Sequence, residues 1–117
     1  MCFVVKYRHK VFRHAKIKEV CEAQMRRTAA HYGIEIKEIG FEEDHVHLLV
    51  SVKPAMSPAD IAHKLKGASA FFLLKIFPWL RRHHFWCGHF WSPAYFFDSV
   101  GEQTYERLEN YVRNQGS

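Results

Sequence analysis

The feature that most restricts the fold is a change of hydrophobic period at Gly33. Residues 15–32 place apolar side chains at helical spacing, whereas residues 34–40 alternate apolar and polar side chains, as a half-buried strand does. Gly33 is well placed to end the helix, because glycine readily adopts the left-handed conformation found at helix C-terminal caps. Residues 45–52 form a second strand after a turn at 41–44. We therefore expect the two strands to pair as an antiparallel hairpin.

The other predicted elements complete an α+β pattern. Ser57 and Pro58 are a typical N-cap and first helical residue, and Pro93 indicates that its strand lies at a sheet edge or contains a bulge. The order β-α-β-β-α-β-α predicts one domain over residues 1–117, an antiparallel β-sheet flanked by α-helices. The remaining elements are expected as a strand at 2–7, a helix at 58–77, a basic aromatic connector at 79–90, a strand at 91–99 and a helix at 102–115.

The composition indicates which class of molecule the protein binds and in which cellular compartment it works. The net charge of +5, with the histidines counted as neutral, favours a polyanion, and nucleic acid before a membrane. The cysteines Cys2, Cys21 and Cys87 are odd in number and form no C-x-x-C pair, so we expect them to be reduced. Neither a signal peptide nor an apolar run long enough to span a membrane is present. These features predict a cytoplasmic protein.

His45 and His47 are the residues that most resemble a chemical site. Residues two apart on a strand point to the same face, so both imidazoles can reach one metal ion. The alternative is a pair of ordinary histidines on a half-exposed strand. His83, His84 and His89 could extend a metal site, although an irregular connector would position ligands poorly. Surface or DNA contacts are the better interpretation of those three.

Three further features each allow two interpretations. Asp44 could orient a neighbouring histidine or cap the turn before the strand. The small residues 67–70 permit close approach of either another backbone or a ligand. Trp91 could stack on a base, although core packing is the more common role of a tryptophan.

Tyr111 and Gln115 stand four residues apart, on one face of the last predicted helix.

Five segments together resemble a known family. They are KYRHKV at 6–11, DHVHLLV at 44–50, KLKGASA at 64–70, GHFWSPAYF at 88–96 and YVRNQ at 111–115. In this order they resemble the single-tyrosine HUH transposases of the insertion-sequence 200/605 type, in the superfamily of REP-associated tyrosine transposases. The matches cover nearly the whole chain. The resemblance implies a ferredoxin-like HUH fold with a C-terminal helix that carries the tyrosine.

The resemblance also implies the chemistry. Tyr111 would attack a phosphodiester of single-stranded DNA, forming a 5′-phosphotyrosine and a free 3′-OH. His45, His47 and Gln115 would hold a divalent cation, magnesium or manganese, although imidazole generally favours other metals. The expected substrate has hairpin ends, and the expected active form is a homodimer that acts at the nucleoid without a nucleotide cofactor. The basic residues expected to contact phosphates are Arg8, Lys10, Lys64 and Lys66.

Three alternatives to a transposase stay open at this point. The first is a domesticated relative that cuts repeated chromosomal hairpins. The second is a non-catalytic protein that binds DNA hairpins, against which the presence of His45, His47, Tyr111 and Gln115 argues. The third is an unrelated metal-binding regulator that uses His45, His47 and His89.

Overall fold

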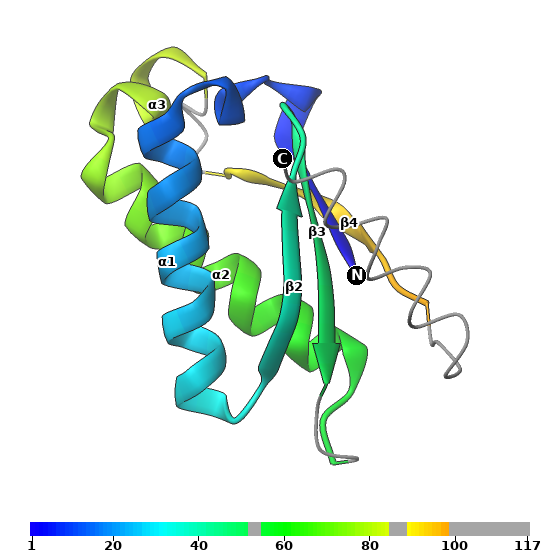
Figure 1. The fold of residues 1–117 in the computed structure, drawn as a ribbon. Helices are drawn as coiled ribbons and strands as arrows, with labels where there is room; N and C mark the ends of the chain where they lie inside the picture. Colours follow the sequence, from blue (N-terminus) through cyan, green and yellow to red (C-terminus); the bar gives the residue numbers. More distant parts are fainter. Residues whose placement is uncertain (52–54, 85–88, 99–117) are drawn as a thin grey trace.

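Four strands form a single antiparallel sheet in the computed structural model, which describes residues 1–51, 55–84 and 89–98. The strands are β1 (Cys2–Val5), β2 (Glu35–Phe41), β3 (His45–Ser51) and β4 (Trp91–Phe96), and their order in the sheet is β2-β3-β1-β4. Two long helices, α1 (Ala15–Tyr32) and α2 (Pro58–Ile76), pack on one face of the sheet (Figure 1). Because β3 lies between β1 and β2, the unit β1-α1-β2 is a split βαβ unit, as in ferredoxin-like folds.

The predicted hairpin and both long helices are confirmed. The residue Gly33 has φ 72° and ends α1, with the Gly33 and Ile34 N–H groups donating to carbonyls of the last helical turn. Strands β2 and β3 pair antiparallel. Ser57 caps α2 by accepting a hydrogen bond from the Asp60 N–H, and the Asp60 carboxylate accepts one from the Ser57 N–H. The α+β class and the antiparallel sheet are therefore as the sequence predicted.

Three elements differ from the prediction by more than one residue. Strand β1 ends at Val5 rather than at residue 7, because Tyr7 and Arg8 adopt left-handed backbone conformations inside the 3₁₀ turn Lys6–Arg8. The connector predicted at 79–90 begins as a short helix, α3 (Pro78–His83), because proline is suited to the first helical position. Strand β4 ends at Phe96 rather than at 99. The helix predicted at 102–115 lies outside the described residues.

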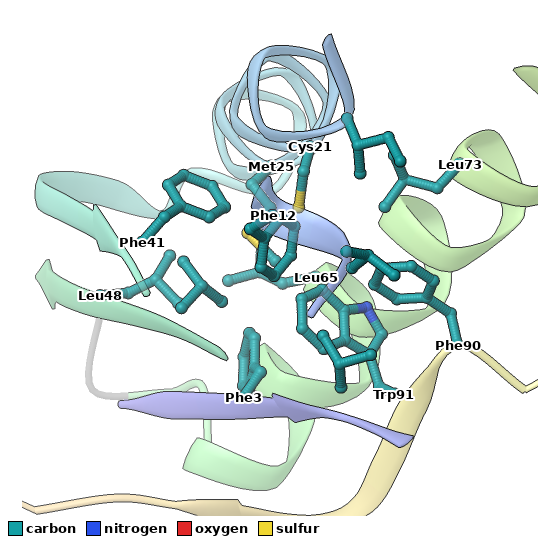
Figure 2. Close-up of a cluster of buried hydrophobic side chains, with 14 of the residues drawn as sticks. Phe3, Phe12, Cys21, Met25, Phe41, Leu48, Leu65, Leu73, Phe90 and Trp91 are labelled. Atoms are coloured by element: carbon teal, nitrogen blue, oxygen red, sulfur yellow. The ribbon is translucent and has the colours of Figure 1, made fainter. Parts of the chain in front are cut away.

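The core lies between the sheet and the two helices (Figure 2). The inner face of the sheet contributes Phe3 and Leu48, while α1 contributes Cys21 and Met25. Burial raises the pKa of the Cys21 thiol, which keeps it protonated and unreactive. Edge strand β4 has a register irregularity against β1, so both effects expected of Pro93 are present.

Trp91 packs against Ser69 of α2 in this core. The Trp91 ring is buried, and its indole N–H donates a 2.9 Å hydrogen bond to Ser69 Oγ. Ser69 is fully buried, and its hydroxyl donates to the Leu65 carbonyl at 2.7 Å. Ser69 thus serves packing, whereas Gly67 is exposed, and Trp91 is a core residue rather than a base-stacking platform.

We expect Ser69→Ala to lower the free energy of unfolding by about 1–3 kcal/mol, because it leaves the buried Trp91 indole N–H without its acceptor. Urea denaturation measures this loss directly. Ser51→Ala is the matched control, since Ser51 is exposed at the end of β3 and its loss should change stability by less than about 0.5 kcal/mol. Equal losses in the two variants would contradict the role assigned to Ser69.

Candidate metal-binding site

The side chains of β3 alternate between the core and the opposite face of the sheet. Val46 and Leu48 are buried among the core residues, so His45 and His47 project from the face that α1 and α2 do not cover. In the antiparallel register His47 lies opposite Cys2 of β1, and His45 lies opposite Val4. Both histidines are partly buried. The predicted pairing of these two imidazoles on one face is therefore present.

The two imidazoles meet through their Nε2 atoms, which lie 3.0 Å apart. The ring planes are nearly perpendicular, at 86°. Two nitrogen ligands at about 2.1 Å from a shared ion, and at roughly a right angle, would also be separated by about 3.0 Å. Two unprotonated nitrogens this close repel each other unless a proton or a cation lies between them. The 3.0 Å separation therefore fits either a hydrogen bond from one imidazole N–H to the other nitrogen or two ligands of one metal ion.

Asp44 determines which ring nitrogen of His45 faces His47. Its Oδ1 lies 2.6 Å from His45 Nδ1, and an ionised carboxylate can only accept, so Nδ1–H is the donor. The Nε2 lone pair of His45 is then directed toward His47. The backbone of Asp44 is also held, because its carbonyl accepts a hydrogen bond from the Val5 N–H at 2.9 Å. Of the two roles that the sequence left open for Asp44, the structure shows the orientation of a histidine.

The pKa values at the site favour an ionised carboxylate and a neutral imidazole. Partial burial acts to raise the pKa of Asp44, but hydrogen bonds from His45 and Arg8 outweigh burial and lower it. Burial, followed by the nearby His45, lowers the pKa of His47. A histidine must be neutral to bind a metal through nitrogen, so the environment of His47 favours the ligand form.

The four predicted phosphate contacts lie in different places. Arg8 is at the site, with its Nε 3.0 Å from Asp44 Oδ2. Lys10 lies nearby and pairs with Glu43 at 3.7 Å. Lys64 is on α2, where its Nζ sits 4.8 Å from the centre of the Tyr32 ring at the end of α1. The structure thus brings two of the four basic residues to the turn that leads into the start of β3, next to His45.

Lys66 makes contacts that the sequence did not predict. Its Nζ donates to the Ser92 carbonyl at 2.7 Å and lies 3.3 Å and 3.5 Å from those of Pro93 and Ala94. Burial lowers the pKa of its ammonium group. These contacts attach β4 to α2. In the structure Lys66 therefore holds an edge strand, and we do not include it in the surface that we propose for DNA.

A groove beside the histidines was also not predicted. It encloses about 490 Å³, and its lining residues come from β1, β3, β4 and the turn after β1: Cys2, Val4, Arg8, His45, Ser92, Ala94 and Phe96. No short sequence motif signals it, because it arises where three strands meet. The groove places His45 and Arg8 on the wall of one concave surface.

Within the described residues, the histidines that could have extended the metal site, His83, His84 and His89, form no metal-binding group with His45 and His47. His84 lies against His9 instead, with ring centroids 4.7 Å apart. Over residues 1–51, 55–84 and 89–98, no group of three or more His, Cys, Asp or Glu side chains could hold a metal ion. The alternative of a regulator that binds metal through His45, His47 and His89 is therefore wrong. Tyr111 and Gln115 lie outside the described residues.

Within residues 1–51, 55–84 and 89–98, no helix is both long and apolar enough to cross a membrane.

A basic α+β domain with two histidines paired on one sheet face fits a DNA-processing enzyme. The sequence model described as "Transposase IS200 like" matches residues 1–115. The chain belongs to this family of insertion-sequence transposases.

Individual relatives agree with the family assignment. The chain is 33% identical to the ISDra2 transposase TnpA of Deinococcus radiodurans, over 98% of this chain and 81% of that protein. It is 30% identical to the transposase for insertion sequence element IS200 of Salmonella typhimurium, over 97% of this chain and 72% of that one. A crystal structure of a Deinococcus radiodurans R1 protein assigned as a transposase superposes with a TM-score of 0.78. It has 32% identity and covers 99% of this chain and 88% of the other.

Proposed function

We propose that this transposase cuts and rejoins single-stranded DNA through a covalent bond between Tyr111 and a 5′-phosphate. The phenolate oxygen of Tyr111 would attack the phosphorus, and the bond from phosphorus to the 3′-oxygen would break, releasing a 3′-OH. The covalent link conserves the energy of the broken bond, so a 3′-OH can later reverse the reaction without ATP. Membership of the IS200-like family supports this proposal.

The observation that carries the proposal is the 3.0 Å separation of the Nε2 atoms of His45 and His47. These two nitrogens, with the side-chain oxygen of Gln115, would hold magnesium or manganese. When bound, the cation would polarise the phosphodiester and stabilise the charge that develops on it. Asp44 would keep the His45 ring in the ligand orientation, since its carboxylate already accepts the Nδ1–H hydrogen bond.

The proposed substrate is single-stranded DNA with hairpin ends. Arg8 and Lys10 lie near the histidines, where they could contact phosphates on either side of the cut, although such contacts carry no sequence information. We propose a homodimer as the active form, in which the segment with Tyr111 in one subunit, predicted as a helix from the sequence, can complete the histidine site of the other subunit. The protein would act on DNA at the nucleoid.

Cleavage assays with single-stranded and duplex DNA test this proposal. Labelled oligonucleotides that carry the ends of the encoding insertion sequence are incubated with the protein and manganese, then resolved on a denaturing gel. We expect a covalent protein–DNA band from the single strand, and at least about tenfold less from the duplex, because opening one base step costs about 1.4 kcal/mol. Equal cleavage of the duplex, or retarded DNA without a covalent band, would contradict the proposal.

A further inference from the structure

We infer that Arg8 is a positioning residue of the metal site, acting on His45 through Asp44. The inference rests on the proposed metal-binding role of His45 and His47. Arg8 Nε donates to Asp44 Oδ2 at 3.0 Å, and the other oxygen of the same carboxylate accepts the His45 Nδ1–H at 2.6 Å. A carboxylate held at both oxygens cannot rotate freely. The contact with Arg8 therefore restricts the direction in which His45 presents its Nε2 atom.

The backbone around Arg8 supports this role. Tyr7 and Arg8 are consecutive residues with positive φ values, 61° and 53°, although neither is glycine. Among the described residues they are the only non-glycine positions in this conformation. Strained backbone of this kind persists where surrounding contacts enforce it, and it is common at functional sites. Here the residues just before it are anchored, because the Val5 N–H donates to the Asp44 carbonyl and the Lys6 N–H to the Phe90 carbonyl, both at 2.9 Å.

The side chain of Arg8 is far more exposed to solvent than those of Asp44 and His45. The Arg8 side chain is 73% exposed, whereas Asp44 and His45 are 15% and 22% exposed. An exposed ion pair of this type usually contributes little to stability. The contact can therefore orient Asp44 at the site while adding little to the free energy of unfolding.

Because Arg8 is positively charged, the direction in which its removal changes metal affinity tests its role. A positive side chain beside a cation site repels the cation, so its removal should strengthen metal binding if charge alone matters. If Arg8 instead positions Asp44 and His45, its removal should weaken metal binding, because the ligand is held less firmly. The two explanations predict changes in opposite directions.

Arg13 provides a matched control. It lies in the same segment, its Nε is 3.2 Å from Glu43 Oε1, and its side chain is 60% exposed. Arg13→Ala therefore removes one positive charge and one contact to the same turn, without touching Asp44. Any effect specific to the contact between Arg8 and Asp44 should be absent from this variant.

Manganese binding, followed by the electron paramagnetic resonance of the free ion, is the first measurement. We expect Arg8→Ala to weaken binding about fivefold, the upper end of what an exposed ion pair contributes, and Asp44→Asn about 10–100-fold. Arg8→Ala should add no further loss in the Asp44→Asn background, and Arg13→Ala should leave binding unchanged. Unchanged or stronger binding in Arg8→Ala, or an equal loss in Arg13→Ala, would overturn the inference.

A second measurement needs no metal and separates this inference from the proposed metal site. The His45 Nδ1–H proton, held by Asp44, should give a downfield NMR signal that exchanges slowly with water. We expect about fivefold faster exchange in Arg8→Ala, as for loss of an exposed ion pair, loss of the slow signal in Asp44→Asn and no change in Arg13→Ala. If the wild type binds no manganese, the metal site fails but this exchange still tests Arg8. Identical exchange in wild type and Arg8→Ala would overturn the inference.

Discussion

Tyr111→Phe is expected to eliminate the covalent protein–DNA product and to lower the cleavage rate at least about 10⁴-fold, as removal of a catalytic nucleophile does. Phenylalanine keeps the ring but lacks the oxygen that would bond to phosphorus. Binding of single-stranded DNA should persist, because the basic side chains are unchanged. Single-turnover cleavage on a denaturing gel, together with a filter-binding assay, measures both quantities on the same substrate.

Tyr105→Phe is the control for this result. Tyr105 falls in the same predicted terminal helix but outside the YVRNQ segment at 111–115. It should therefore retain the covalent product at the wild-type rate. A covalent band of normal intensity from Tyr111→Phe would show that another residue is the nucleophile. Loss of the band in both variants would point to damage to the terminal segment rather than to the removal of one oxygen.

His47→Ala should produce the second largest loss, about 10³-fold in cleavage rate at a fixed manganese concentration. The variant removes one of the two nitrogens that lie 3.0 Å apart, and a bound metal supplies several kcal/mol of charge stabilisation in the transition state. Raising the manganese concentration should recover part of the rate. A metal titration of single-turnover cleavage measures both the loss and the recovery.

His31→Ala is a suitable control for the histidine variant. His31 is exposed at the end of α1 and contacts Tyr32 rather than the site. It should leave the cleavage rate and the manganese dependence unchanged, while His47→Ala should still bind single-stranded DNA. Cleavage by His47→Ala at the wild-type rate and with the wild-type manganese dependence would rule out the proposed metal site.

Local patterns in the sequence were sufficient to predict much of the fold. The alternation over 34–40 and the helical spacing up to Gly33 gave a strand and a helix at the right places, although β2 pairs with β3 through a register shift between Ile36 and Glu38. Pro93 correctly indicated an irregular edge strand, since proline cannot donate to a neighbouring strand. The pairing of His45 and His47 was also predictable, because it follows from the two-residue period of a single strand.

Contacts between distant residues could not be predicted in the same way. Arg8 and Asp44 are 36 positions apart in the sequence, and their contact depends on the left-handed turn after β1, for which no glycine gives a signal. Lys66 and Ser92 are 26 positions apart, and an exposed phosphate contact was the simpler expectation for that lysine. Such contacts depend on how the elements pack and not on local pattern, so the sequence alone gave no basis for either.

The most direct test of the central proposal is to identify the atom that becomes bonded to DNA. Wild-type protein would be incubated with an end oligonucleotide and manganese, digested with protease and nuclease, and analysed by mass spectrometry. We predict a nucleotide phosphate on the peptide that contains Tyr111, with fragmentation placing it on that tyrosine. A phosphate on a different residue, or cleaved DNA without any protein adduct, would contradict the proposed phosphotyrosine mechanism.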